Sequence, residues 1–330
     1  MVCLIAGIIL LAASLIQDIS GSGAGWRGPA LIIGAIGILL GMYLFPTLKH
    51  HRSIVNFIFV FPLLFTFVVT VIIPLCLGVF YSFTDWNGIK MTGFIGFANY
   101  KAMFSEPSFL WSLIITILFV VLNMVLVNVV AFMLALLCTS KIKGLSFFRA
   151  SYFLPNLIGG IVLGYIWQTL LNGLLSKWGQ PLLSLSARNG FIGMLILLMW
   201  QQIGYMMIIY IAGLNNVSPD LVEAAQIDGA TSRQILFKIK LPMIMPSVTI
   251  CTFLTLTNGF KMFDQNLSLT GGDPGKQSQL LALNIYDTFY ARSGPQWKGI
   301  GQAKAVVFFI LVVAIALIQL KATSSKEVQQ

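Results

Sequence analysis

The sequence predicts an all-α membrane protein, a polytopic bundle of about eight transmembrane helices. Of its residues, 58% are hydrophobic and 9% are charged, whereas about 25% are charged in ordinary soluble domains. Apolar runs that can cross a hydrocarbon core of about 30 Å, which takes about 20 helical residues, recur along the chain. We expect spans at 3–17, 29–46, 54–82, 109–138, 147–171, 190–214, 244–266 and 303–321.

The first two apolar runs form a separate group. The first could be a cleaved signal peptide, but no Lys or Arg precedes it, and signal peptides carry a basic region there. We therefore expect residues 1–50 to be a two-helix transmembrane addition. Residues 51–330 are then the main membrane domain.

Basic residues lie mainly in the loops between the predicted spans. A net charge of +10 would suggest a nucleic acid partner for a soluble protein, but in a membrane protein the placement of Lys and Arg reports orientation. The groups "KHHR", "KIKG", "KIK" before Leu241 and the C-terminal tail fall on one side if the spans alternate. We expect this side to be cytoplasmic, with both termini there, in a multi-pass protein of the cell (inner or cytoplasmic) membrane that binds no nucleic acid. The four cysteines lie in apolar runs without paired spacing and are expected to be packing residues.

The longest polar stretch, "SPDLVEAAQIDGATSRQILFKIKLPMIMPS", lies between the sixth and seventh predicted spans. Ser218 followed by Pro219 is a helix start, because a Ser side chain can accept from a free backbone N–H and Pro fits the first helical position. Gly229 suits a helix end. Thr231, or the Ser after it, opens a second short segment that Pro242 is expected to break. The stretch predicts two helices at the cytoplasmic surface.

The spacing within this stretch resembles the EAA loop of binding-protein-dependent ABC importer permeases. The matching positions are Glu223, Ala224, Ala225, Gly229, Ile239, Leu241 and Pro242. Three further stretches, "FIGFANYKAMF", "FFRASYFLPNLIGGIVLGYIW" and "LTGGDPGKQSQLLALNIYDTFY", are similar to the sugar-uptake branch of that family, which includes maltose, raffinose, multiple-sugar and glycerol-3-phosphate permeases. The resemblance covers residues 54–321 and implies the type I ABC importer permease fold, with the EAA coupling loop at 218–245.

The resemblance also implies partners. In such systems the EAA loop forms a coupling helix that docks in a cytoplasmic ABC ATPase dimer. A homologous second permease subunit, an extracellular or periplasmic substrate-binding protein, a sugar substrate and membrane lipid are implied as well, with no cofactor. The chain itself is then no enzyme. The run "GDPGK" is similar to a P-loop, but Thr270 stands where the first Gly belongs and Gln277 follows the Lys in place of Ser or Thr.

Polar side chains inside the predicted spans mark a candidate substrate path, because such groups are costly in lipid and usually face a cavity or a partner helix. Amides beside aromatic rings suit sugars, whose hydroxyls need many neutral partners. The resemblance to the maltose permease brings six residues onto or beside its sugar site: Asn156, Gln201, Gln202, Tyr205, Asn258 and Lys261. Asn123 and Asn128 are further possibilities. The alternative is that these groups bond between helices.

Lys261 keeps a second solute class open. It departs from the neutral residue of a maltose-type site, which could mean an acidic ligand such as glycerol 3-phosphate, or an ion pair with Asp264 three residues on in the same predicted helix. A more distant alternative is an ion-coupled carrier, which would place several ionisable residues in its spans. An intramembrane enzyme is disfavoured, because the only histidines, His50 and His51, occur without an HExxH motif or a carboxylate pair.

Overall fold

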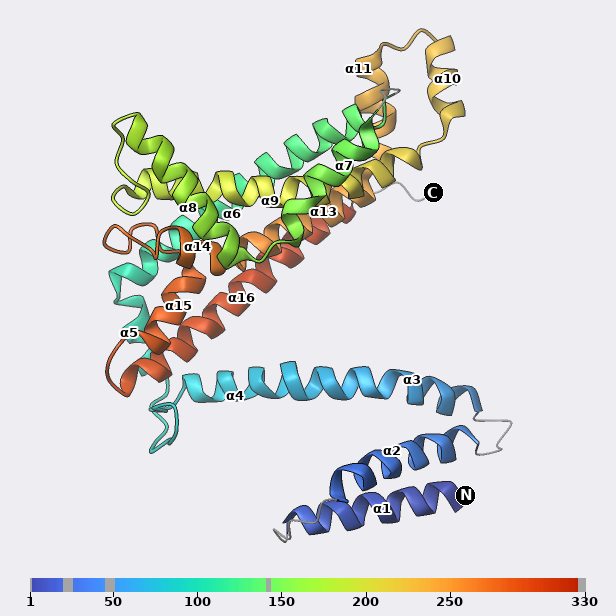
Figure 1. The fold of residues 1–330 in the computed structure, drawn as a ribbon, viewed down its shortest axis with the longest axis vertical. Helices are drawn as coiled ribbons and strands as arrows, with labels where there is room; N and C mark the ends of the chain where they lie inside the picture. The colour runs from blue at the N-terminus through green and yellow to red at the C-terminus, as the bar shows by residue number, and fades with distance from the viewer. Residues whose placement is uncertain (1, 20–25, 45–50, 141–143, 326–330) are drawn as a thin grey trace. The chain divides into compact units, whose positions relative to one another are not determined.

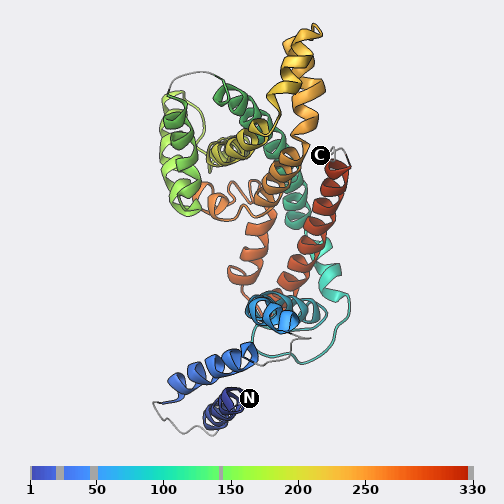
Figure 2. The same ribbon diagram turned by 90° about the vertical axis from the view of Figure 1, so that its right-hand side faces the viewer.

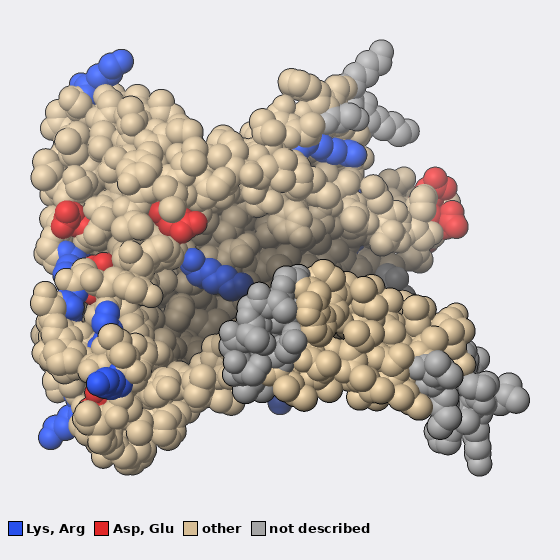
Figure 3. All heavy atoms as spheres, turned by 60° about the horizontal axis from the view of Figure 1, so that its bottom comes forward, with Lys and Arg blue, Asp and Glu red and all other residues tan. Residues whose placement is uncertain are grey.

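The computed structural model describes residues 2–19, 26–44, 51–140 and 144–325. Every regular element within these ranges is helical, and the chain divides into two compact units, residues 1–78 and 79–330. Residues 45–50, which include His50, lie outside the described residues. On the face drawn in Figure 3, charged side chains gather in a few small groups and leave broad uncharged areas, as expected for a surface in contact with lipid.

The first unit begins with two helices that are packed through glycines, α1 (Val2–Ile19) and α2 (Arg27–Tyr43). A Cβ added at Gly7 would lie 2.7 Å from the backbone nitrogen of Ile38, and one at Gly41 would lie 2.6 Å from the Cβ of Leu4. Small residues of this kind let helix backbones approach closely within a membrane. The two helices have 18 and 17 residues, slightly fewer than the roughly 20 that a bilayer crossing takes.

The next span is one long helix with a local change of pitch. It comprises α3 (His51–Phe67), the π-helical turn η1 (Val68–Ile72) and α4 (Ile73–Ser82), the last of which runs on into the second unit. Its apolar part covers 28 residues, long enough to cross a membrane. This agrees with the predicted span at 54–82.

Three further long helices form the frame of the second unit: α6 (Pro107–Cys138), α9 (Ala187–Asn215) and α16 (Gln296–Ser324). The largest buried cluster lies mainly between α6 and α9, where Ala131 and Ala135 of α6 are fully buried beside Met206 and Tyr210 of α9. Small residues on one helix facing large ones on the other fill the space between two backbones without voids.

The fifth predicted span is bent, and a second bend lies at the start of the seventh. The fifth consists of α7 (Leu145–Phe153), the 3₁₀ turn η2 (Leu154–Leu157) and α8 (Gly160–Lys177), with a 105° bend at the break. It is therefore not the single helix expected at 147–171. Pro155 and the Gly159–Gly160 pair explain the break, because Pro lacks a backbone donor and glycine weakens a helix. Within the described residues, four helices are long and apolar enough to span a membrane, or six if each bent pair counts as one span.

The seventh predicted span, 244–266, contains α13 (Met245–Phe260), which ends six residues before the predicted end. The helical segment before it consists of α11 (Ser232–Ile235), the π-helical turn η3 (Leu236–Lys240) and α12 (Leu241–Met243), and it meets α13 at a 70° bend. The expected break before the next span is confirmed, but it lies at Ile244, two residues after Pro242. The segment runs from η3 through Pro242 to Met243 without interruption.

Four shorter helices complete the second unit: α5 (Ala98–Phe104), α10 (Pro219–Ile227), α14 (Asp264–Leu269) and α15 (Leu281–Tyr290). Figures 1 and 2 show α10 and α11 projecting from one end of this unit, which we call the α10 end. At the opposite end, the α15 end, α5 and α15 pack against the first half of α16. The two ends carry the polar segments that the sequence places outside the spans.

Gly204 of α9 packs so closely against α7 that no side chain fits there. A Cβ added at Gly204 would lie 1.8 Å from the carbonyl oxygen of Tyr152. We expect Gly204→Ala to lower the free energy of unfolding by about 1–3 kcal/mol, the usual cost of overpacking, measured as the melting temperature of the purified chain. Gly173→Ala in α8 is the matched control, since nothing lies within 4 Å of its added Cβ. Equal melting temperatures for the two variants would contradict this packing.

Candidate functional site

A polar cavity of about 290 Å³ lies where the bent fifth span meets α9, α13 and α14. It is lined by Asn156, Gly160, Leu198, Gln201, Gln202, Asn258, Lys261, Met262, Asp264 and Gln265. Five of the six residues predicted for a substrate path therefore come together around one space, although they derive from three separate spans. Tyr205 is not among the lining residues, and its ring packs against Phe153 with 6.3 Å between the ring centroids.

The break in the fifth span forms one wall of this cavity. The amide of Gln201 donates to the carbonyl oxygen of Ile158 at 3.3 Å, and Gln265 of α14 donates to the amide oxygen of Gln201 at 2.9 Å. A helix break leaves backbone carbonyls without their usual partners, and in a membrane these must be satisfied internally. Gln201 therefore links the break to both α9 and α14.

Gln202 brings a buried polar atom without a partner to the cavity wall. Its side chain is 4% exposed, it lines the cavity, and its amide oxygen has no hydrogen-bond partner among the described residues. A buried acceptor without a partner costs about 1–3 kcal/mol. A hydroxyl donor that enters the cavity would remove this cost.

Two charged side chains line the same cavity. Lys261 follows directly after the end of α13, where its backbone N–H bonds the carbonyl of Thr257 at 3.1 Å, and Asp264 is the first residue of α14. The expected single helix across both residues is wrong, because the helix ends at Phe260. No salt bridge joins Lys261 to Asp264, both of which the structure describes. The close spacing in sequence therefore does not make them an intrahelical pair.

Helix α14 is held against α8 by glycines. A Cβ at Gly160 would lie 2.8 Å from the Cβ of Asp264, and one at Gly164 would lie 1.7 Å from the hydroxyl oxygen of Ser268. The amide of Gln168 in α8 also donates to the carbonyl oxygen of Leu269 at 2.9 Å. These contacts place the first residues of α14 in the cavity wall.

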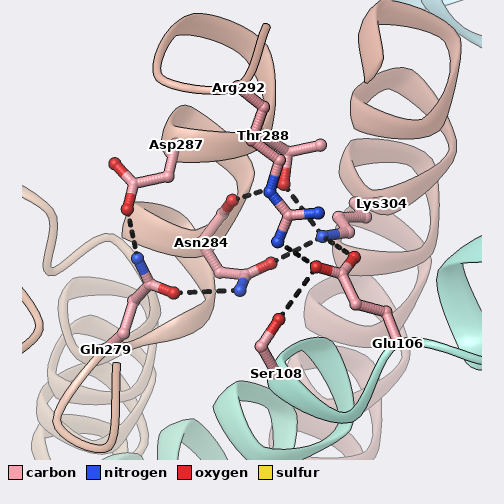
Figure 4. Close-up of polar contacts among 8 residues, drawn as sticks. All are labelled: Glu106, Ser108, Gln279, Asn284, Asp287, Thr288, Arg292 and Lys304. Atoms are coloured by element: carbon pink, nitrogen blue, oxygen red, sulfur yellow. Dashed lines mark hydrogen bonds and ion pairs between the residues drawn. The ribbon is translucent and has the colours of Figure 1, made fainter. Parts of the chain in front are cut away.

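A second polar cluster, at the α15 end, was not predicted (Figure 4). Lys304 of α16 is fully buried, with its ammonium 2.7 Å from a carboxylate oxygen of Glu106, just before α6. The ammonium also donates to Asn284 at 2.9 Å and to Thr288 at 2.8 Å, both in α15. Arg292 forms an ion pair with the other oxygen of Glu106. A lysine within an apolar run is a signal that would have identified this site from sequence, but its partners lie far away in the chain.

Glu106 is the charge that links the three elements of this cluster. Burial acts to raise the pKa of its carboxyl group, but hydrogen bonds from Arg292 and Lys304 outweigh this effect, so that the pKa lies below its ordinary value. Ser108 also donates to the carboxylate at 2.9 Å. The carboxylate is therefore stabilised in its charged form and ties α6 to α15 and α16.

The predicted EAA segment forms α10 and the turn that follows it. Ser218 occupies the N-cap position as expected, but its side chain makes no capping hydrogen bond. The predicted helix end at Gly229 is confirmed, since the φ of Gly229 is +76°. The backbone N–H of Gly229 donates to the carbonyl oxygen of Gln226, and the backbone N–H of Ala230 donates to the carbonyl oxygen of Ala225 at 2.9 Å. This pattern is a Schellman motif, which favours glycine.

The segment after Gly229 begins with a capping box. The Thr231 hydroxyl accepts from the backbone N–H of Gln234, whose side chain accepts from the backbone N–H of Thr231. The later EAA positions lie in η3 and α12 and are half-buried: Ile239, Leu241 and Pro242. This part of the segment is therefore joined to the bundle, whereas α10 projects from it (Figure 2).

No residue of α10 is buried. Ala224 is exposed and Ala225 is half-buried. Glu223 and Lys240 line a cavity of about 400 Å³ between α10 and the ends of α6 and α9. Small exposed residues on a projecting helix leave room for the close approach of another protein.

Comparison with known proteins places these features in a family. A family model described as "Binding-protein-dependent transport system inner membrane component" matches residues 33–322. A probable starch degradation products transport system permease protein of Thermoanaerobacterium thermosulfurigenes is 42% identical, over 82% of this chain and 94% of the relative. A multiple sugar-binding transport system permease protein of Streptococcus mutans is 32% identical, over 77% of this chain and 90% of the relative.

The fold resembles a solved structure as well. A chain of a bacterial ABC transporter involved in the import of the acidic polysaccharide alginate superposes with a TM-score of 0.72 at 19% sequence identity, over 84% of this chain and 97% of that chain. The fold is thus that of an ABC importer permease. Because the family model covers most of the sequence and a relative is 42% identical across 82% of it, the chain belongs to the family of binding-protein-dependent transport system inner membrane components.

Proposed function

We propose that the chain is a transmembrane permease subunit of an ATP-driven, binding-protein-dependent carbohydrate importer. The family membership and two relatives named for starch products and multiple sugars support this proposal. The observation that carries it is the polar cavity, in which five side-chain amides line one space and the buried oxygen of Gln202 has no partner among the described residues. Neutral donors and acceptors of this kind suit the hydroxyls of a sugar.

The chain would form half of the translocation path. A homologous second permease subunit would supply the other half, and an extracellular or periplasmic binding protein would deliver the sugar at the α15 end. The α10 end would face the cytoplasm, where its basic residues agree with the positive-inside rule. There the projecting helix α10 would dock on a separate ABC ATPase dimer, which would hydrolyse the ATP.

Gln202 provides a direct test of the cavity. We expect Gln202→Leu to lower the uptake of starch-derived oligosaccharides by about tenfold, since one hydrogen bond contributes about 1.4 kcal/mol. The measurement is uptake of radiolabelled maltotriose and longer maltooligosaccharides by cells in which this variant replaces the native gene. Asn123→Leu in α6 is the matched control, because Asn123 is also a buried amide without a partner among the described residues but does not line the cavity. Equal uptake by the two variants would contradict a role for the cavity.

The energy source separates this proposal from the ion-coupled alternative. An ATP-driven importer should keep transporting when a protonophore removes the proton gradient, as long as cellular ATP is maintained. Uptake that stops with the gradient while ATP remains high would favour the ion-coupled carrier. Loss of the gene without any change in carbohydrate uptake would overturn the proposed function.

A further inference from the structure

The loop between α4 and α5, residues 83–97, exposes large apolar side chains, and we call it the aromatic loop. Ile89 is 89% exposed, Phe97 is 73% exposed and Phe94 is 69% exposed. In Figure 1 the loop lies at one edge of the α15 end. A group of exposed apolar side chains marks a contact with another protein or with lipid. We therefore expect this loop to contact something other than water.

Hydrogen bonds hold the aromatic loop in one shape. Asp85 accepts from the backbone N–H groups of Thr92 and Gly93 at 2.9 and 2.8 Å. At the base of the loop, the amide of Asn99 in α5 donates to the carbonyl oxygen of Thr84 at 2.8 Å. Asp85 is the only acidic residue of the loop, and its carboxylate is satisfied by bonds within the loop. The exposed apolar side chains are therefore presented on a fixed backbone.

The tip of the aromatic loop lies level with the first turn of α16. Gly88 has a φ of +101°, which favours glycine, and a Cβ added there would lie 3.6 Å from the Cγ of Lys298. Helix α16 has 29 residues and is therefore about 43 Å long, which matches the roughly 40–45 Å of a bilayer with its headgroups. The first turn of α16, and with it the tip of the loop, therefore falls in the headgroup region.

Aromatic contacts join the loop to the end of the preceding span. The exposed ring of Phe80 in α4 lies 5.7 Å from the ring of Tyr81, and Tyr81 stacks on Trp86 of the loop with 4.9 Å between the centroids. Trp and Tyr are enriched at the membrane–water interface, because their rings combine an apolar body with a polar group. Lys90, the only basic residue of the loop, is exposed beside Ile89. The loop therefore combines the apolar, aromatic and basic groups that a lipid interface attracts.

We propose that the aromatic loop is a lipid anchor, in which Ile89, Phe94 and Phe97 insert into the bilayer leaflet at the α15 end and Lys90 binds phospholipid phosphate groups. The main alternative partner is the binding protein. A soluble protein would meet surfaces that project into water, whereas this loop lies level with the start of a span. The anchor adds a membrane contact outside the spans, and it does not depend on the transported solute.

The test places a photocrosslinker in the full chain within living cells. The amino acid p-benzoylphenylalanine replaces Ile89, Phe94 or Phe97 in turn, the cells are irradiated, and the tagged chain is purified and digested. We expect mass spectrometry to find most of the crosslinked peptide from each position joined to a phospholipid. Adding Lys90→Glu to the variant at position 89 should lower the lipid yield, because a carboxylate repels phosphate groups.

Ile227 is the matched control, since it is an isoleucine with 87% exposure but lies on the projecting helix α10. The photocrosslinker at position 227 should give no lipid product. Crosslinks from the loop to another protein, or no crosslinked product at all, would overturn the inference. Equal lipid yields at positions 89 and 227, or a yield unchanged by Lys90→Glu, would overturn it as well. These outcomes leave the proposed function intact, whereas a gene deletion without effect on carbohydrate uptake would remove that function and leave the lipid contact unchanged.

Discussion

Replacing Lys304 with methionine is expected to lower the free energy of unfolding by about 3 kcal/mol, because it leaves the carboxylate of Glu106 in a largely buried site with one ionic partner fewer. The amide oxygen of Asn284 and the hydroxyl of Thr288 lose their donor at the same time. Helix α15 would then be held less firmly against α16. The measurement is the melting temperature of the purified full-length chain, which should fall by several degrees.

Lys321→Met is the matched control, since Lys321 lies in the last turn of the same helix and is exposed. It should change the stability by less than about 0.5 kcal/mol, as surface substitutions usually do. The combination of Lys304→Met with Glu106→Gln should cost less than the sum of the two single changes, because the second change removes the charge that the first leaves unpaired. Strict additivity, or a Lys304 variant as stable as the control, would show that the ion pair does not hold this end together.

Replacing Ala224 with tryptophan is expected to lower carbohydrate uptake at least about tenfold, or about 1.4 kcal/mol, while leaving the folded chain unchanged. Ala224 is exposed on α10, a helix without buried residues, so the bundle itself has room for the larger side chain. A docked ATPase would not have this room, because a close contact tolerates little added volume. The measurements are uptake of labelled maltooligosaccharides and the amount of ATPase that purifies with the chain.

Ala322→Trp provides the comparison, since Ala322 is an exposed alanine in the last turn of α16 and is not part of α10. Both variants should keep the native melting temperature and the native amount of protein in the membrane. If the Ala224 variant transports at the native rate, α10 is not the docking element. If it loses transport together with its melting temperature, the loss reflects folding and not coupling.

The local chemistry of α10 could be predicted in detail from the sequence. Its start after Ser218 and its end at Gly229 depend on capping signals a few residues apart. The capping role of the Ser218 side chain could not be predicted so reliably, since the side chain makes no capping bond in the structure. The N-cap position depends on backbone angles alone, whereas the capping hydrogen bond also depends on the rotamer of the side chain.

The bent spans show where a pattern of apolar residues is insufficient. Hydropathy reports that a segment is buried in lipid or protein, and it does so equally for a straight helix and for one that breaks. Pro155 and the Gly159–Gly160 pair weaken the fifth span, and at its 105° bend the amide of Gln201 in α9 donates to the carbonyl oxygen of Ile158. Likewise, the spacing of Lys261 and Asp264 suggested one helix, and the actual end of α13 at Phe260 separated them.

The sequence by itself determined the membrane class, the approximate spans, the EAA spacing and the polar residues of the candidate path, because each of these is a local or periodic property. Only the tertiary structure decided that Asn156, Gln202 and Asn258 share one cavity, and that Lys304 meets Glu106. These groups come from segments distant in sequence, and which of them meet depends on helix bends and on close packing at glycines such as Gly160 and Gly204. Contacts of this kind follow from the fit of whole helices against one another, and no short stretch of residues contains that information.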